Sequence, residues 1–167
     1  MSMSDARIQI FCGDGHGKSA AAIGRGIAAA CEGRSVFVVR FLKGKASMDL
    51  DFVRRLEPEV KLFSFDKSER TYSELNEEEK QEEALHIRNG LNYARKVAAT
   101  GECDLLILDE ILDVINMGIL SAEDVTALFA EAGDSIQLIL TGSGACRGLW
   151  PYADSVVMLT EEKPQQA

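Results

Sequence analysis

The sequence predicts an α/β domain in which helices cover both faces of a parallel β-sheet. Segments rich in β-branched and aromatic residues alternate with helical patterns along the whole chain, which is the order typical of such sheets. Residues 104–109 (DLLILD) form an apolar run without alternation, as expected of a strand buried on both faces. The length of 167 residues suits one compact domain. We expect residues 1–160 to form it and residues 161–167 to be a disordered tail.

The first expected strand, residues 7–12, is followed by a glycine-rich turn and an alanine-rich helix over residues 18–32. Gly33 is a natural stop for that helix because glycine readily adopts the left-handed conformation of a helix end. Residues 35–41 (SVFVVRF) are rich in β-branched and aromatic side chains and form the second expected strand.

A short helix over residues 49–56 and a third strand over residues 60–65 come next. The helix should end before Pro58, because the residue that precedes a proline is disfavoured in helical conformation. The longest helix is expected over residues 77–100. Asn76 and Glu79 form its capping box, in which each side chain accepts the other residue's backbone N–H.

After the central strand over residues 104–109, Ser121 caps a further helix with Asp124 at its third position. This helix should run to about Ala132. The remaining expected elements are a strand over residues 136–141, a short helix over residues 146–150 and a last strand over residues 155–159.

Composition excludes several classes of partner. The net charge of −9 argues against binding to a nucleic-acid backbone, which requires clustered Lys and Arg. No apolar run approaches the roughly 20 residues that cross a bilayer. The four cysteines, which show no C-x-x-C spacing, are expected to be reduced and mostly buried, as in a cytoplasmic protein: Cys12, Cys31, Cys103 and Cys146.

Residues 13–19 (GDGHGKS) lie between the first strand and the first helix, where a phosphate-binding loop belongs. Glycines allow backbone N–H groups to turn towards phosphate oxygens, and the helix N-terminus adds positive charge. Lys18 would contact the phosphates, and the Ser19 hydroxyl would bind Mg²⁺. The usual spacing G-x-x-x-x-G-K-[ST] has Cys12 at its first position here, so a loop that begins at Gly13 is one residue shorter.

A glycine-rich turn that binds nothing is the alternative for this segment. Asp109 and Glu110 follow the central strand, where P-loop proteins place an acidic residue for Mg²⁺. Such a pair alone is also common as a simple helix cap. The two motifs together favour a P-loop NTPase-like, RecA-like fold with a nucleotide site. The acidic run over residues 77–83 and His86 are expected to form solvated faces of the longest helix.

Four segments in order resemble the ATP:corrinoid adenosyltransferases of the bacterial cobalamin pathway. They are residues 13–44, 104–120, 138–144 and 153–156. The resemblance covers nearly the whole chain and includes the shortened loop, the strand end Phe41-Leu42-Lys43-Gly44 and the pair Asp109-Glu110.

This resemblance implies an enzyme that uses ATP and a corrinoid, which is cobalamin or a precursor. The cobalt(I) of the corrinoid attacks C5′ of ATP and expels triphosphate, and Mg²⁺ assists. It implies Lys18 and Glu110 as catalytic residues, and Ser19, Asp109 and Glu110 as metal ligands. The expected substrate-binding residues are Gly13, Asp14, Gly15, His16, Gly17, Lys18, Ser19 and Ala20 for ATP and Tyr72 for the corrinoid. A homodimer and a corrinoid-reducing flavoprotein partner are also implied.

The chain departs from the family pattern at several positions. His16 replaces a lysine, Ser143 an arginine and Arg70 an aromatic residue, and the basic tail expected after the last strand is absent. These departures leave open a paralogue that binds ATP or the corrinoid without turnover. A P-loop kinase or NTPase that acts at the γ-phosphate is a further alternative, and the short loop counts against it.

Overall fold

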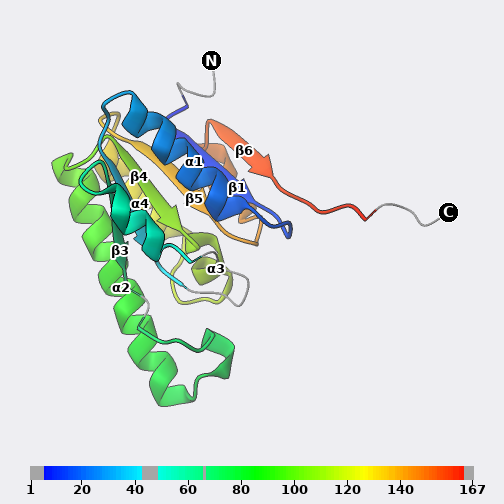
Figure 1. Cartoon of the computed structure of the whole chain (residues 1–167). Coiled ribbons are helices and arrows are strands. Elements are labelled where there is room, and N and C mark those ends of the chain that lie inside the picture. The colour runs from blue at the N-terminus through cyan, green and yellow to red at the C-terminus, as the bar shows by residue number, and fades with distance from the viewer. Residues whose placement is uncertain (1–5, 43–48, 66, 164–167) are drawn as a thin grey trace.

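A computed structural model of the chain describes residues 6–42, 49–65 and 67–163. Within them lies one six-stranded sheet of order β3-β2-β4-β5-β1-β6, in which every pairing is parallel (Figure 1). The strands are β1 (Ile8–Cys12), β2 (Val36–Arg40), β3 (Val60–Ser64), β4 (Leu105–Asp109), β5 (Gln137–Thr141) and β6 (Ser155–Met158). The predicted α/β class is confirmed, and so is the interior position of β4, whose five residues are all buried.

Four α-helices and three 3₁₀ helices are present in the described part of the chain. They are α1 (Lys18–Cys31), α2 (Glu77–Thr100), α3 (Ile111–Asn116), α4 (Ala122–Ala132), η1 (Asp51–Leu56), η2 (Tyr72–Glu74) and η3 (Arg147–Tyr152). The expected short helices over 49–56 and 146–150 are thus the 3₁₀ helices η1 and η3. Each is six residues long, and Pro151, which disfavours a regular α-helix, lies inside η3.

Both predicted capping boxes are present. The Asn76 side chain accepts the N–H of Glu79, and the Glu79 carboxylate accepts the N–H of Asn76, each at 2.9 Å. At α4, Asp124 accepts the N–H of Ser121 at 2.9 Å, and the Ser121 hydroxyl accepts the N–H of Asp124 at 3.1 Å. These bonds satisfy N–H groups that helix geometry leaves without partners, and so they fix where the helices begin.

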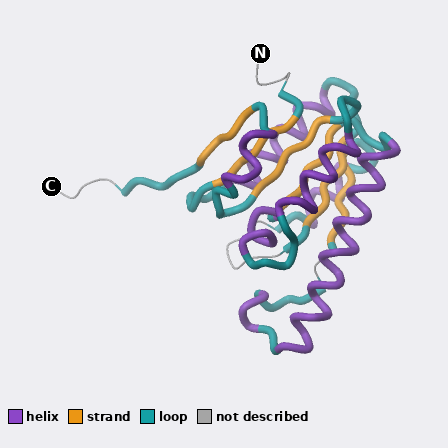
Figure 2. Tube along the Cα trace, turned by 180° about the vertical axis from the view of Figure 1, so that it is seen from behind, coloured by secondary structure: helices purple, strands orange, loops and turns teal. Residues whose placement is uncertain are grey.

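The helices form a layer on each face of the sheet. On one face, α1 and η1 pack on the sheet through side chains such as Ile23 and Val53. On the other face, seen in Figure 2, α2, α3, α4 and η3 bury residues such as Ile87, Leu128 and Leu149. The apolar strands are therefore covered on both sides, which explains why they show no alternation of polar residues.

The long helix α2 extends past the sheet, and its first turns project beyond the strands together with η2 (Figure 1). The expectation that residues 77–83 are all solvated is wrong for Glu83, which is buried. The segment that follows β3 folds back on the helix, and the N–H of Lys67 donates to the Glu83 carboxylate at 3.3 Å. His86 is partly buried and lines a small cavity with these two residues, so it is not fully solvated either.

All four cysteines are free. Cys12 and Cys103 are buried and Cys146 is partly buried, as expected, but Cys31 is exposed at the end of α1. Burial raises the pKa of Cys103 to about 12 and that of Cys146 to about 11. No helix of the described residues is long and apolar enough to span a lipid bilayer.

Candidate nucleotide site

The carboxyl ends of four neighbouring strands bring the candidate residues to one edge of the sheet. The loop over residues 13–17 follows β1, whereas Asp109, Thr141 and Arg40 are the last residues of β4, β5 and β2. Because β5 alone separates β1 from β4, the loop and Asp109 lie close together. Ligands of open α/β sheets bind at this edge.

The loop after β1 depends on glycine for its shape. Gly13 has a φ of +108° and Gly17 one of +97°, values that other residues rarely adopt. A Cβ on Gly13 would lie 2.3 Å from the carbonyl oxygen of Leu159, and one on Gly15 would lie 2.9 Å from it. The N–H of Gly15 donates to that same oxygen at 2.9 Å. The loop therefore rests on the chain after β6, and the Gly15 amide is already engaged there.

Lys18 and Ser19 begin α1 and turn towards the loop and the sheet. The Lys18 ammonium donates to the carbonyl oxygen of Gly15 at 2.6 Å, so it lies folded over the loop. The Ser19 hydroxyl donates to the Asp109 carboxylate at 2.6 Å. This bond joins the two sequence motifs that were proposed to form one site, 90 residues apart in the chain.

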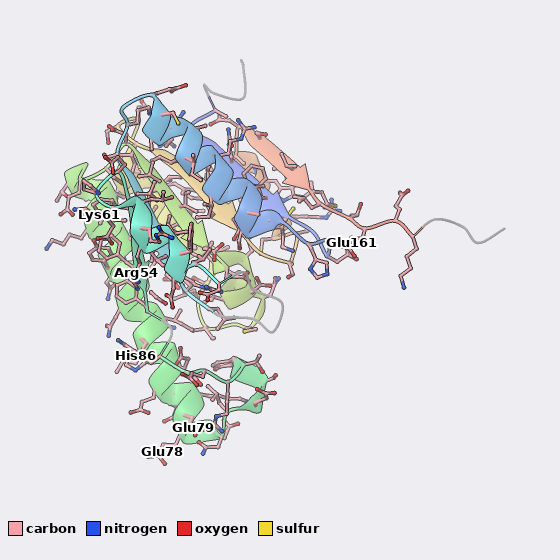
Figure 3. The ribbon with its side chains drawn as sticks, in the orientation of Figure 1. Arg54, Lys61, Glu78, Glu79, His86 and Glu161 are labelled. Atoms are coloured by element: carbon pink, nitrogen blue, oxygen red, sulfur yellow. The ribbon has the colours of Figure 1, made fainter. Side chains whose placement is uncertain are left out.

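Asp14, His16 and Ala20 are exposed on the outer side of the loop and the first turn of α1. The His16 ring nitrogen Nε2 lies 3.7 Å from a carboxylate oxygen of Glu161, and both side chains are mostly exposed. Figure 3 labels Glu161 on the segment that follows β6. A positive charge at position 16 would therefore have a carboxylate neighbour.

Asp109 is the most buried acidic residue of the site, at 1% exposure. Its Oδ1 accepts hydrogen bonds from Ser19 and, at 2.9 Å, from the Thr141 hydroxyl. Its Oδ2 has no hydrogen-bond partner and lies 3.9 Å from Nε of Arg40. Burial raises the pKa of Asp109, while the two hydroxyl groups and the guanidinium of Arg40 oppose that rise. A buried carboxylate oxygen without a donor is a site that a cation would satisfy.

Glu110 follows directly and caps α3 in a left-handed conformation, with a φ of +65°. Its N–H donates to the Thr141 hydroxyl at 2.9 Å, so Thr141 joins both acidic residues. Burial, followed by the neighbouring carboxyl groups of Asp113 and Asp109, raises the pKa of Glu110 to about 9, against the lowering effect of Lys18. Positive charge that enters the site would favour the ionised form of Glu110.

Sequence reasoning missed Thr141, Asp113 and Arg40. The two carboxylate oxygens of Asp113 accept the N–H of Ser143 at 3.1 and 3.2 Å. Ser143 stands where the family pattern has an arginine, and here its backbone bonds to Asp113. Their positions in the sequence could have indicated them. Thr141 and Arg40 each end an expected strand, and the carboxyl ends of parallel strands meet at the same edge of the sheet.

These residues fit a hard divalent cation such as Mg²⁺. The Ser19 hydroxyl and the carboxylates of Asp109 and Glu110 supply oxygen ligands, and Asp109 Oδ2 has no hydrogen-bond partner. Among the described residues no cluster of three or more His, Cys, Asp or Glu side chains could hold a metal. Mg²⁺ does not need one, because it is usually bound through one or two carboxylates and the phosphates of a substrate.

Tyr72 lies in η2, on the projecting segment and not beside the loop (Figure 1). The Lys80 ammonium lies 5.7 Å from the centroid of its ring. Arg70, at the position of an aromatic residue in the family pattern, pairs with Glu79 on the first turn of α2. The expected strand-end residues Lys43 and Gly44 lie outside the described residues.

Comparison with known proteins identifies relatives along nearly the whole chain. The family described as ATP:corrinoid adenosyltransferase BtuR/CobO/CobP matches residues 4–166. The corrinoid adenosyltransferase of Escherichia coli K12 is 29% identical over 159 residues, which cover 93% of this chain and 77% of the relative. The corrinoid adenosyltransferase CobA of Salmonella typhimurium is 29% identical over 160 residues, with the same coverage. That of Pseudomonas aeruginosa is 27% identical over 158 residues, covering 90% and 73%.

Proposed function

Since the chain belongs to the ATP:corrinoid adenosyltransferase family, an enzyme family whose substrates are ATP and a corrinoid, we propose that it transfers the 5′-deoxyadenosyl group of ATP to cobalt(I) and releases triphosphate. The observation that carries this proposal is the hydrogen bond between Ser19 and Asp109, which connects a shortened phosphate loop to a buried acidic strand end. Neither kinase nor NTPase activity is favoured by the comparisons, since the relatives are named corrinoid adenosyltransferases.

The reaction needs no activated side chain as nucleophile. The electron pair of cobalt(I) forms the Co–C bond to C5′, and the C5′–O bond breaks with its electrons going to the triphosphate. The protein's part is to hold C5′ near the cobalt and to neutralise the growing charge of the leaving group.

In this proposal, Lys18 leaves the Gly15 carbonyl oxygen and contacts the triphosphate. Residues 13–20 would surround the phosphates, and Gly13 and Gly17 supply the positive φ angles that the turn of this loop requires. Ser19, Asp109 and Glu110 would hold Mg²⁺, which when bound supplies positive charge to the leaving triphosphate. Thr141 positions the Asp109 carboxylate and the backbone of Glu110 through its hydroxyl group.

Several further features belong to the same proposal. Tyr72 would contact the corrinoid from the projecting segment, and one domain over residues 1–160 would carry the whole site. The enzyme would act in the cytoplasm as a homodimer, and a flavoprotein would supply it with reduced corrinoid. The departure at His16 is tolerable here because Lys18 and the loop amides already provide positive charge to the phosphates.

Incubation with ATP, Mg²⁺ and a chemically reduced corrinoid tests the proposal. The expected result is the light-sensitive absorption spectrum of a Co–C bond, and the Lys18→Met variant should lose it. Binding of ATP without any alkylcorrinoid, across corrinoids with and without amidated side chains, would instead support a paralogue that has lost catalysis.

A further inference from the structure

Arg40 is buried, and one nitrogen of its guanidinium group has no hydrogen-bond partner. It is the last residue of β2, at the same sheet edge as Asp109, and is 5% exposed. Its Nε lies 3.5 Å from the carbonyl oxygen of Leu42 and 3.9 Å from Asp109 Oδ2. Its Nη2 is buried and has no hydrogen-bond partner.

A buried donor without an acceptor is unfavourable and calls for an explanation. The carboxylate of Asp109 does not supply the missing acceptor, because its Oδ2 lies 3.9 Å from Nε and Nη2 has no hydrogen-bond partner. An arginine kept only to neutralise Asp109 would leave one of its donor nitrogens without function. The unpaired nitrogen points to a ligand that is absent when the substrates are absent.

Arg40 also lines a cavity of about 150 Å³ at the carboxyl ends of β2 and β3. Ser64, Lys67 and Ser68 contribute further donors to its wall. Three acidic residues, Asp49, Asp51 and Glu69, also border it, but all three are exposed to solvent. Asp49 accepts the N–H of Asp51 at 3.0 Å, and Asp51 lies 3.8 Å from Arg54 (labelled in Figure 3), so two of them already have local partners.

Arg40 is therefore the buried charged residue of the cavity wall, whereas Lys67 and the three acids are exposed to solvent. A guanidinium group pairs best with a planar carboxylate, through charge-assisted hydrogen bonds. The cavity lies at the same sheet edge as the phosphate loop but at the end of β2 and β3, which β4 and β5 separate from β1. The triphosphate is assigned to the loop, so this cavity is available to the second substrate.

Corrinoids carry acetate and propionate side chains around the macrocycle, either as free acids or as amides. We propose that Arg40, assisted by Lys67, binds one free carboxylate of the corrinoid and thereby selects acid-bearing corrinoids over fully amidated ones. This inference rests on the proposed function and specifies its substrate class.

Competition between two corrinoids tests it. The ratio of kcat/KM for a carboxylate-bearing corrinoid to that for a fully amidated one is measured in the unaltered protein and in variants. Arg40→Gln should lower this ratio about tenfold, since the charge-assisted bond is lost. Lys67→Met, at an exposed position, should lower it about threefold. Any effect of Arg40 on Asp109 is common to both corrinoids and cancels in the ratio.

Lys61→Met is the matched control. Lys61 lies in the edge strand β3, its ammonium lies 5.7 Å from the centroid of the Phe37 ring of β2, and it does not line the cavity, so the ratio should not change. Thermal melting shows whether the Arg40→Gln variant is folded. If it is not, Lys67→Met still tests the proposal.

Spectroscopic titration of both corrinoids separates the possible failures. If the protein turns over both corrinoids with equal kcat/KM, or if neither variant lowers its preference for the carboxylate-bearing one, the carboxylate site is overturned and the proposed function is not. A binding preference lost in the variants, but without turnover in any protein, supports the carboxylate site and overturns the proposed function. Absence of both binding and turnover overturns both.

Discussion

Thr141 shows how one hydroxyl group can position a site. It accepts the N–H of Glu110 and donates to Asp109, and it is completely buried. No sequence motif predicted its role, because a threonine at the end of a strand is common in any sheet. Only the pairing of strands far apart in sequence placed it between the two acidic residues.

Replacement of Thr141 by valine keeps the shape of the side chain but removes both hydrogen bonds. The partly buried N–H of Glu110 then lacks an acceptor, so the free energy of unfolding should fall by about 1–3 kcal/mol. Urea denaturation measures this. Thr141→Ser keeps the hydroxyl and should lose less; equal losses in the two variants would show that the methyl group, and not the hydroxyl, is what matters.

Glu110 makes the stability of the metal-free protein depend on pH. Its pKa in the folded protein is raised to about 9, above its value in the unfolded chain, so between these values the folded state binds more protons. Unfolding free energy measured in EDTA should therefore decrease as pH rises from roughly 5 to 9. Glu110→Gln should reduce this slope. A slope unchanged in the variant would contradict the assigned environment of Glu110.

At the scale of elements, the sequence allowed the order and type of the strands and long helices to be predicted. The glycine loop, Asn76 and Ser121 are local signals, and each marks the element boundary found in the structure. Burial of Glu83 was not predictable in this way. It depends on the fold-back of the segment after β3, which no residue near Glu83 encodes.

The loop after β1 offers a test at this scale. Gly13→Ala places a methyl group against the carbonyl oxygen of Leu159, besides straining a φ of +108°. Gly33→Ala strains a comparable φ of +81° with nothing within 4 Å of the new methyl group. We expect Gly13→Ala to destabilise the fold by about 1–3 kcal/mol more than Gly33→Ala does, and to weaken ATP binding. Similar melting temperatures would contradict the close packing of the loop on Leu159.

For the molecule as a whole, two cores on opposite faces of one sheet fix the edge at which the strand ends meet. The pairing of loop and Asp109 was predictable, because both motifs had known places relative to strands. The contribution of Arg40 was not, because it depends on how β2 aligns beside β4.

The accessibility of the four thiols reports whether this packing exists in solution. An Ellman titration near pH 8 should show one fast-reacting thiol, Cys31, which is exposed. Cys12 and Cys103 are buried and have raised pKa values, so they should react only after denaturation. The Cys31→Ser variant should lose the fast phase; fast reaction of Cys103 in the native protein would contradict the assigned core.

Product analysis of one reaction mixture tests the central claim most directly. With ATP, Mg²⁺ and a reduced corrinoid, the amounts of alkylcorrinoid and triphosphate should rise together in a ratio of about one to one, because a single bond to C5′ is exchanged. ADP or diphosphate as the nucleotide-derived product, with no Co–C bond formed, would contradict it.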